Sequence, residues 1–339
     1  MGKMSDAISK LVSPINKLID LMGQACGKWY EPIHVKRMAK ANSEAMKIMQ
    51  EAIGSSPELN AAYNNGMIKI DNEQLNGLVV RGMQRAVYQE TVKQQNIESV
   101  ADKAYGLLEN EPPVTDEPVD NDWMARFINS VESVSDEDMQ LLWAKVLAGE
   151  IKKPKSYSLR TLESLKNLSK DEAILFQKLS DYVITKDNSC FFVNEDGIEF
   201  NGGSVYNNLQ DMLVLNECGI TNVTPLLQTT FTYPVGGSDK FYNDNYILMF
   251  KNITDKKQQI AIQVFNLTSF GKQLMEIMEK NTSDEFFIAF SKYLKVHYAN
   301  QFEFALYKII EKTENEVRFD KSVDYLSVDY LIDRADSSI

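Results

Sequence analysis

The sequence predicts a mainly α-helical protein with multi-helix N-terminal and central units and a small α+β module of winged-helix type. Apolar residues recur at three- and four-residue steps through much of the first 184 residues, which is the period of an amphipathic helix. Helix start signals precede several of these runs, and strand-like runs dominate only after residue 184. A chain of 339 residues exceeds the size at which one hydrophobic core keeps growing, so we expect more than one packed unit.

The N-terminal region, residues 1–110, opens with an apolar stripe at helical spacing. Pro14 lies inside this stripe and is expected to kink the helix or to delay its start to Ser13. The stripe predicts either an interface with a partner or a surface that docks on the body of the same chain. The candidate interface residues are Leu11, Ile15, Leu18, Ile19 and Trp29.

Two further helices and a linker are predicted before residue 119. An amphipathic helix over residues 33–53 carries basic residues on its polar side, and a long helix extends from about Asn72 to Leu108. Residues 111–118 contain three prolines and three acids, a composition that cannot continue a helix. We therefore interpret them as an exposed linker.

Residues 119–184 are predicted to form a core of four helices in close succession. The expected start signals are Asp120 or Asn121, Ser135, Ser156 or Ser158, and Ser169. Ser169, followed three residues later by Glu172, has the pattern of a capping box. Several aromatic residues fall at core-facing spacings and are interpreted as core anchors: Trp123, Phe127, Trp143 and Phe176.

The remaining residues divide into a mixed module and a C-terminal segment. Residues 185–280, preceded by the helix that starts at Ser169, show the order of a winged-helix-like unit. The predicted strands are 190–193, 197–200, 229–233, 246–250 and 260–265, and the predicted helices are 207–215 and one that begins near Leu267. Residues 281–339 are predicted to be largely helical over 284–310, followed by an acidic tail that repeats the sequence SVDYL.

Composition limits the class of protein. The net charge is −12, yet residues 1–50 carry +4, so a basic arm precedes an acidic body. This balance argues against a dedicated DNA-coating protein. No run of about 18 apolar residues predicts a membrane span. The first residues lack a secretory signal, and the three cysteines have no paired spacing, so we expect a cytoplasmic protein.

No catalytic constellation is recognisable, and we predict no catalytic, cofactor-binding or metal-binding residues. The two histidines, His34 and His297, lie in segments that look unrelated, and each is interpreted as structural. The glycine pairs lack the Lys-Ser/Thr of a phosphate-binding loop. Acidic residues around the linker are interpreted as helix caps and solvated side chains, because one segment supplies converging metal ligands poorly.

Two groups of basic residues are candidates for binding an anionic partner. The first, at a helix junction, comprises Lys152, Lys153, Lys155 and Arg160. The second, in the presumed wing, comprises Lys251, Lys256 and Lys257. The presumed recognition helix, residues 207–215, has no Lys or Arg, and affinity for duplex DNA depends largely on neutralising phosphates. Nucleic acid is therefore not the favoured partner.

The segment from Glu117 to Phe176 resembles a bacterial family called domain of unknown function 2806. The likeness rests on the runs EPVDNDWMARF, SDEDMQLLWAKVLAGEI and SYSLRTLESLKNLSKDEA, and it extends over roughly residues 11–278. The LWAKVLAGE run and the leucines after it are also similar, more distantly, to the Abi-alpha abortive-infection family. The first resemblance implies no catalytic residues. The second implies a link to phage exclusion, in which an infected cell stops growing.

These observations favour a non-enzymatic bacterial interaction protein that serves in an abortive-infection-like antiphage response. We expect it to act through a protein partner or through self-association into a homo-oligomer. One alternative is a nucleic-acid-binding regulator that uses the winged-helix-like module and the basic junction. Another is an effector that lays its N-terminal amphipathic stripe on a membrane surface.

Overall fold

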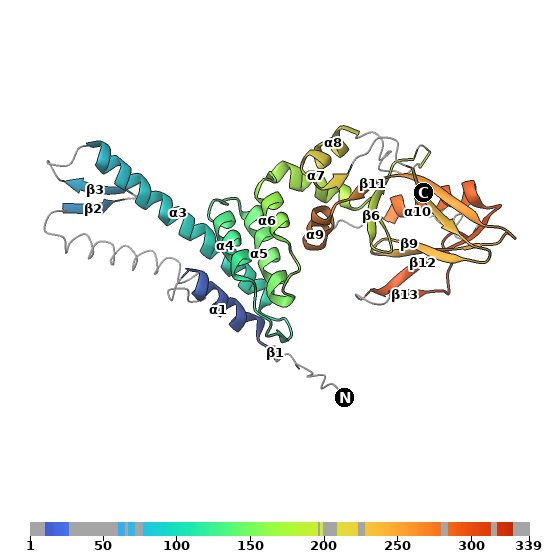
Figure 1. Cartoon of the computed structure of the whole chain (residues 1–339), viewed down its shortest axis with the longest axis horizontal. Coiled ribbons are helices and arrows are strands. Elements are labelled where there is room, and N and C mark those ends of the chain that lie inside the picture. Colours follow the sequence, from blue (N-terminus) through green and yellow to red (C-terminus); the bar gives the residue numbers. More distant parts are fainter. Residues whose placement is uncertain are drawn as a thin grey trace, which may run out of the picture. The chain divides into compact units, whose positions relative to one another are not determined.

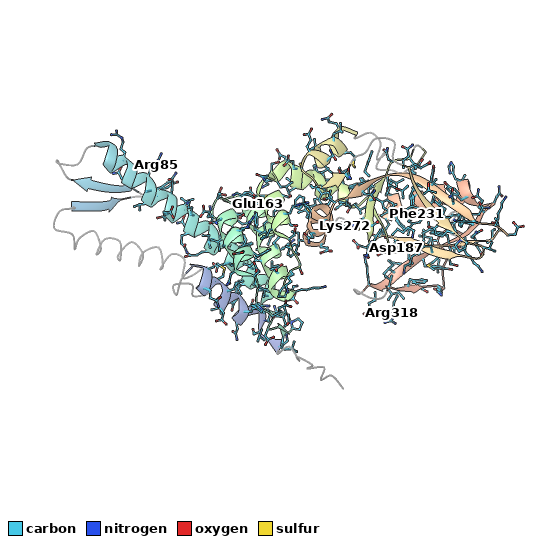
Figure 2. The ribbon with its side chains drawn as sticks, viewed as in Figure 1. Arg85, Glu163, Asp187, Phe231, Lys272 and Arg318 are labelled. Atoms are coloured by element: carbon cyan, nitrogen blue, oxygen red, sulfur yellow. The ribbon has the colours of Figure 1, made fainter. Side chains whose placement is uncertain are left out.

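The described part of the computed structural model falls into two compact units, residues 1–166 and 167–339 (Figure 1). The described residues are 11–26, 60–64, 67–71, 77–195, 197–198, 209–222, 228–278, 284–312 and 317–327. We call residues 1–166 the helical unit and residues 167–339 the C-terminal unit. In Figure 2, Arg85 and Glu163 mark the helical unit, and Asp187, Phe231, Lys272 and Arg318 mark the C-terminal unit.

In the helical unit, α1 packs against α3, α4 and α5, and both α4 and α5 pack against the long helix α3. Its helices are α1 (Pro14–Cys26), α3 (Gly77–Leu108), α4 (Asn121–Val131), α5 (Glu137–Lys152) and α6 (Leu159–Lys166). Its strands are β1 (Leu11–Val12), β2 (Asn60–Asn64), β3 (Met67–Asp71) and β4 (Val114–Thr115). β2 pairs with β3, and β1 pairs with β4, so part of the expected linker is a short strand.

Capping side chains and aromatic packing define the centre of this unit. Asp120 Oδ1 accepts a hydrogen bond from the Trp123 backbone nitrogen at 2.8 Å, which confirms one predicted helix start. The cap of α5 is Asp136, one residue later than predicted, because its carboxylate satisfies two backbone N–H groups. Phe127 stacks on Trp123 and meets Trp143 edge-on at 5.6 Å, so these aromatic residues are core anchors as predicted.

Helix α1 docks on the rest of the helical unit through its apolar stripe. It begins at Pro14, where the missing backbone N–H of proline has no consequence. Leu18 and Met22 are almost completely buried, and the helix contacts α3, α4 and α5. The stripe is therefore largely part of this core, and Leu18 is not a free interface residue.

Replacement of Leu18 by alanine is expected to destabilise the helical unit by about 3 kcal/mol, because a fully buried leucine leaves a cavity. Chemical denaturation followed by far-UV circular dichroism measures the change. Leu11→Ala is the matched control, since Leu11 is 69% exposed and its loss should change stability little. Equal effects of the two changes would show that α1 does not belong to the core.

The C-terminal unit is built on a nine-stranded antiparallel sheet (Figure 1). Its strands are β5 (Val183–Lys186), β6 (Ser189–Val193), β7 (Thr221–Asn222), β8 (Gln228–Tyr233), β9 (Ser238–Tyr242), β10 (Tyr246–Asn252), β11 (Gln258–Leu267), β12 (Phe302–Lys312) and β13 (Val317–Asp320). Its helices are α7 (Lys170–Ser180), α8 (Leu209–Glu217), α9 (Ser269–Ile277) and α10 (Asp284–Tyr298). The strand order is β13-β12-β10-β9-β5-β6-β11-β7, with β8 on β11.

Alternation along the strands separates the two faces of the sheet. One face is apolar and packs against α10, whose Phe290 ring meets Phe241 edge-on at 5.6 Å. In β12, buried Phe302, Phe304 and Leu306 alternate with more exposed residues, which is the pattern of a half-buried strand. The core of this unit therefore lies between the sheet and α10.

The predicted fold class is wrong, because a large antiparallel sheet takes the place of the small winged-helix-like module. The strands at 190–193, 229–233, 246–250 and 260–265 exist as predicted, but they join one sheet instead of forming a small wing. Residues 302–310, predicted to be helical, are strand β12. Their period-two alternation, and not their apolar content, was the decisive signal.

The predicted four-helix core is also divided between the two units. α4, α5 and α6 belong to the helical unit, whereas α7 belongs to the C-terminal unit. Ser169 and Glu172 form the predicted capping box at the start of α7. Among the described helices, none is sufficiently long and apolar to cross a bilayer. Several predictions lie outside the described residues: Trp29, His34, the helix over 33–53, residues 199–200 of the predicted strand 197–200, and residues 328–331 of the second SVDYL copy.

Candidate functional site

The segment that carries the family resemblance builds a buried junction after α5. The Tyr157 ring lies so close to Gly149 that a Cβ atom there would come within 2.7 Å of it. The Tyr157 carbonyl accepts a hydrogen bond from Trp123 Nε1 at 2.8 Å. Glu150 Oε1 accepts from the Lys155 backbone nitrogen at 2.5 Å, and Oε2 accepts from the Tyr157 nitrogen at 3.0 Å. These residues fix the chain between α5 and α6.

The carboxylate of Glu150 is 1% exposed, and burial raises its pKa. Hydrogen bonds from the backbone of residues 155–157 and the charge of Lys17 oppose that shift without cancelling it. A carboxylate that accepts from two local backbone nitrogens has a structural explanation. The segment that resembles the family therefore forms a turn here. Both carboxylate oxygens of Glu150 are used in holding that turn.

Gly149→Ala is expected to destabilise the helical unit by about 2 kcal/mol, because the added methyl group would overlap the Tyr157 ring. Thermal unfolding of the two proteins measures the difference. Gly106→Ala is the control, since a Cβ there meets no atom within 4 Å. That change should stabilise the α3 helix slightly, so a similar loss at both positions would contradict the packing argument.

The predicted basic junction is largely paired with the acidic linker. Lys152 forms an ion pair with Glu111 at 2.9 Å, and Lys155 forms one with Glu117 at 2.7 Å. Lys153 is exposed just after α5, and Arg160 is exposed in the first turn of α6. Lys155 also has a left-handed backbone, with φ of 70°. This group of residues thus links the linker to the end of α5, and it does not present four uncompensated charges.

Lys17 is a partly buried lysine whose role could not be predicted from the sequence. Its Nζ donates to the carbonyl oxygens of Ile151 at 3.0 Å and Thr115 at 3.2 Å. Burial lowers the pKa of Lys17, and the nearby acids, led by Glu117, partly offset this. A cation at the carboxyl end of α5 is favoured by the helix dipole. Together with buried Leu18, this contact anchors α1, while Leu11 is exposed and Ile15 and Ile19 are half-buried.

A groove lies along α1 and α4 in the helical unit. It consists of two adjoining hollows of about 600 and 470 Å³ that share Leu21, Gln24 and Asn121. Apolar atoms of Met124 and Ile128 line one hollow, and the acids Asp20 and Asp116 line the other. We call this feature the α1–α4 groove. Its lining combines apolar side chains, amides, carboxylates and Lys17, whose Nζ donates to two backbone carbonyls.

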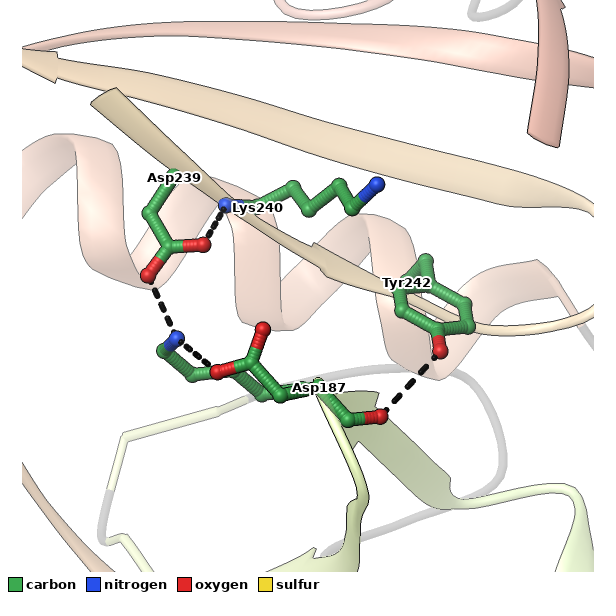
Figure 3. Close-up of polar contacts among 5 residues, drawn as sticks. Asp187, Asp239, Lys240 and Tyr242 are labelled. Carbon is green, nitrogen blue, oxygen red and sulfur yellow. Dashed lines mark hydrogen bonds and ion pairs between the residues drawn. The ribbon is translucent and has the colours of Figure 1, made fainter. Parts of the chain in front are cut away.

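The C-terminal unit contains a buried charged cluster that sequence spacing did not reveal. The Lys186 ammonium pairs with Asp239 on β9 and with Asp187, the latter at 2.8 Å (Figure 3). The same Nζ lies 5.3 Å from the centroid of the Phe231 ring and 6.0 Å from that of Tyr233. We call these five residues the Lys186 centre. Asp239 Oδ1 also accepts from the Lys240 backbone nitrogen at 2.8 Å.

The electrostatics of the Lys186 centre keep its lysine charged. Burial by itself would lower the pKa of Lys186, but Asp187 and Asp239 outweigh it and raise the pKa. A protonated amine is no nucleophile. The Tyr233 hydroxyl is buried beside Asp239 without a hydrogen bond of good geometry, and burial and then that carboxylate raise its pKa. The centre links the turn after β5 to β9 and β8, and this role is structural.

The other predicted or chemically interesting residues lie apart from this centre. Lys251, Lys256 and Lys257 are exposed at the end of β10 and in the turn to β11, and α8 has the sequence LQDMLVLNE without a basic residue.

His297 is exposed, with Nδ1 2.8 Å from the Tyr293 carbonyl. Burial and then Glu172 raise the pKa of Cys218 to about 12, which makes its thiol unreactive. Within the described ranges, no three His, Cys, Asp or Glu side chains gather as a metal site requires.

Comparison with known proteins gives one family. The profile described as Protein of unknown function (DUF2806) matches residues 80–291, from α3 into α10. Neither the curated proteins nor the solved structures give a significant match to the chain. The matched span includes the Trp123–Gly149–Glu150–Tyr157 junction and the Lys186 centre. Because it covers more than half of the 339 residues, the chain belongs to the DUF2806 family.

Proposed function

We propose that this protein is a cytoplasmic bacterial interaction protein that binds a protein partner in an abortive-infection-like antiphage response. The observation that carries the proposal is the α1–α4 groove, whose apolar and acidic lining residues match the apolar and basic sides of an amphipathic helix. The distant resemblance of residues 142–173 to the Abi-alpha family supports the defence role.

The partner is expected to present an amphipathic helix with basic residues along one edge. The apolar side of such a helix would cover Met124 and Ile128, which line one hollow of the groove. Its basic edge would face Asp20 and Asp116, both exposed beside the other hollow. Complementary charges at the edge of a groove mainly set specificity and the rate of association. The acidic body of the chain favours the same partner charge.

A phage challenge tests this proposal in cells. Cells that express the protein should form fewer plaques or stop growing on infection, and Ala125→Arg should abolish that response. Ala125 is exposed and lines the groove, so a bulky charged side chain would fill the hollow without disturbing the core. Arg126→Ala is the control, because Arg126 is exposed, lies outside the lining and makes a 3.7 Å surface pair worth little.

Two results would contradict the proposal. Protection by the Ala125→Arg protein, purified and shown to be folded, would exclude the groove as the binding surface. Cleavage of nucleic acid or nucleotides by the wild-type protein, abolished by one carboxylate substitution that leaves the protein folded, would indicate an enzyme. Native mass spectrometry of the full chain shows whether the bound helix comes from a second copy, which is the homo-oligomer that the sequence led us to expect.

A further inference from the structure

The outer face of the C-terminal sheet carries a row of aromatic side chains. Residues directly opposite one another in a sheet point to the same side. Tyr242 on β9 lies opposite Ile247 on β10, and Ile247 lies opposite Tyr307 on β12. Phe319 on β13 continues the row, since its ring stacks on Tyr307 at 5.5 Å. Alternation along β9, β10 and β12 places this row on the face opposite the α10 core.

The rings of this row are only half-buried, whereas the aliphatic side chain beneath them is fully buried. Tyr242, Tyr307 and Phe319 are each partly exposed, whereas Ile247 is 1% exposed. The rings thus cover Ile247 and leave part of their own surface to solvent. Three partly exposed rings lie across β9, β12 and β13, and we call this surface the aromatic sheet face.

Lysines accompany the rings. Lys312 Nζ lies 5.1 Å from the centroid of Tyr242, and Lys321 Nζ lies 5.3 Å from that of Phe319. Lys240 is one residue before Tyr242 and shares the face of Met249, its partner on β10. Figure 3 shows its side chain extended away from Asp187, so its charge is not used in the Lys186 centre. Cations therefore lie beside the rings from one end of the row to the other.

The acids on this face are fewer, and their charge is matched. Asp244 pairs with Lys312 at 3.1 Å, and Glu303 lies opposite Lys251 in the register of β10 and β12. Asp187 lies beside Tyr242 and pairs with Lys186, and Asp320, the last residue of β13, precedes Lys321. Among the described residues, Lys240 and Lys321 form no ion pair with these acids. The C-terminal unit as a whole contains 16 basic and 25 acidic residues, a net charge of −9. The lysines beside the rings therefore stand out against the acidic composition of this unit.

We propose that the aromatic sheet face binds single-stranded nucleic acid. Bases would stack on Tyr242, Tyr307 and Phe319, and phosphates would contact Lys240 and Lys321. Aromatic residues on an open sheet with nearby cations suit unstacked bases, whose rings are accessible only in single strands. A duplex hides those rings, and α8 offers it no cation. This activity goes beyond the binding of a protein helix by the α1–α4 groove, and it uses other residues.

Fluorescence anisotropy with labelled oligonucleotides of about 12 nucleotides, as RNA and as DNA, tests the proposal on the full chain. The wild-type protein should bind a single strand more tightly than the matching duplex. Tyr242→Ala combined with Tyr307→Ala should weaken binding by at least about tenfold, because each stacked base contributes substantially. Lys240→Glu combined with Lys321→Glu should weaken binding and reduce its dependence on salt between about 50 and 200 mM.

Controls separate this surface from general attraction to polyanions. Lys256→Glu combined with Lys257→Glu makes the same charge change in the exposed β10–β11 turn and should leave affinity nearly unchanged. Tyr242→Phe combined with Tyr307→Phe keeps both rings and should retain binding, and circular dichroism of the alanine protein shows whether that protein is folded. Absence of binding by the wild type at low salt would overturn the proposal. Equal binding of duplex, heparin or an acidic phosphopeptide, or equal loss in the Lys256 and Lys257 control, would also overturn it. These outcomes leave the phage test of the groove unaffected.

Discussion

Lys186→Ala is expected to destabilise the C-terminal unit by about 4 kcal/mol, because it leaves the carboxylate of Asp239 without its buried partner. The side chain of Lys186 is 6% exposed and that of Asp239 is 23% exposed, so water compensates the loss poorly. The ammonium also lies over the rings of Phe231 and Tyr233, and those contacts disappear as well. Urea denaturation followed by tyrosine fluorescence and circular dichroism measures the loss.

A double-mutant cycle separates the ion pair from simple packing. Lys186→Met combined with Asp239→Leu keeps apolar volume and removes both charges, so it should recover most of the stability lost in Lys186→Ala. Asp187→Asn is the matched single change for the other ion pair. Because the Asp187 side chain is 72% exposed, it should cost well under about 1 kcal/mol. An equal loss from Asp187→Asn and Lys186→Ala would rule out a buried origin of the effect.

The same centre gives the protein a dependence on alkaline pH. The folded-state pKa of Lys186 lies above its usual value of 10.5, so its stabilising contribution is fully present below pH 10.5. That contribution is lost as the pH rises through the raised pKa. The protein with Lys186→Met and Asp239→Leu should lack this part of the alkaline loss. Parallel alkaline unfolding curves would contradict the assignment.

Glu150→Ala is expected to destabilise the helical unit by about 4 kcal/mol, because the backbone N–H groups of Lys155 and Tyr157 lose their buried acceptor. The turn that holds Tyr157 against Gly149 and Trp123 would lose its anchor at the same time. Denaturant unfolding of the full chain at neutral pH measures the change. Glu163→Ala is the control, since that side chain is 54% exposed and forms only a 3.7 Å surface pair.

Glu150→Gln adds a test of the carboxylate itself. The folded-state pKa of Glu150 is raised, so wild type loses stability as the pH rises from 4.5 through that pKa. Glutamine does not titrate, and its amide can satisfy only one of the two N–H groups with its oxygen. The glutamine protein should therefore be less stable, with a deficit that is largest in acid and shrinks toward neutral pH. A deficit that grows with pH would reverse the sign of the argument.

The sequence anticipated individual elements better than their assembly. Ser169 with Glu172 and Asp120 before Trp123 identified real helix starts, because capping depends on residues within one turn. The strands around residues 190, 230, 248 and 262 were predicted for the same local reason. What failed was the size of the sheet, since the pairing of β10 with β12 joins residues about 60 positions apart in the sequence. No local pattern specifies such a pairing.

In the candidate sites, too, the sequence identified single residues, and only the fold showed which of them lie together. Lys152 and Lys155 were recognisable as a basic junction, but only the fold shows that Glu111 and Glu117 neutralise them. Lys186 and Asp239 form one buried cluster although they belong to strands that are far apart in the chain. Tyr242, Tyr307 and Phe319 likewise become one surface only through strand register. Residue spacing along the chain contains no information on these groups.

By itself, the sequence determined the family resemblance, the helix caps, the aromatic anchors of the helical unit and the uneven distribution of charge. These properties depend on residue identity and on contacts within a few positions. The tertiary structure alone decided that α1 docks on its own unit, that the C-terminal unit is a sheet covered by α10, and which charges are paired. Those outcomes depend on burial and long-range pairing, because the free energy of a contact depends on what else is removed from water.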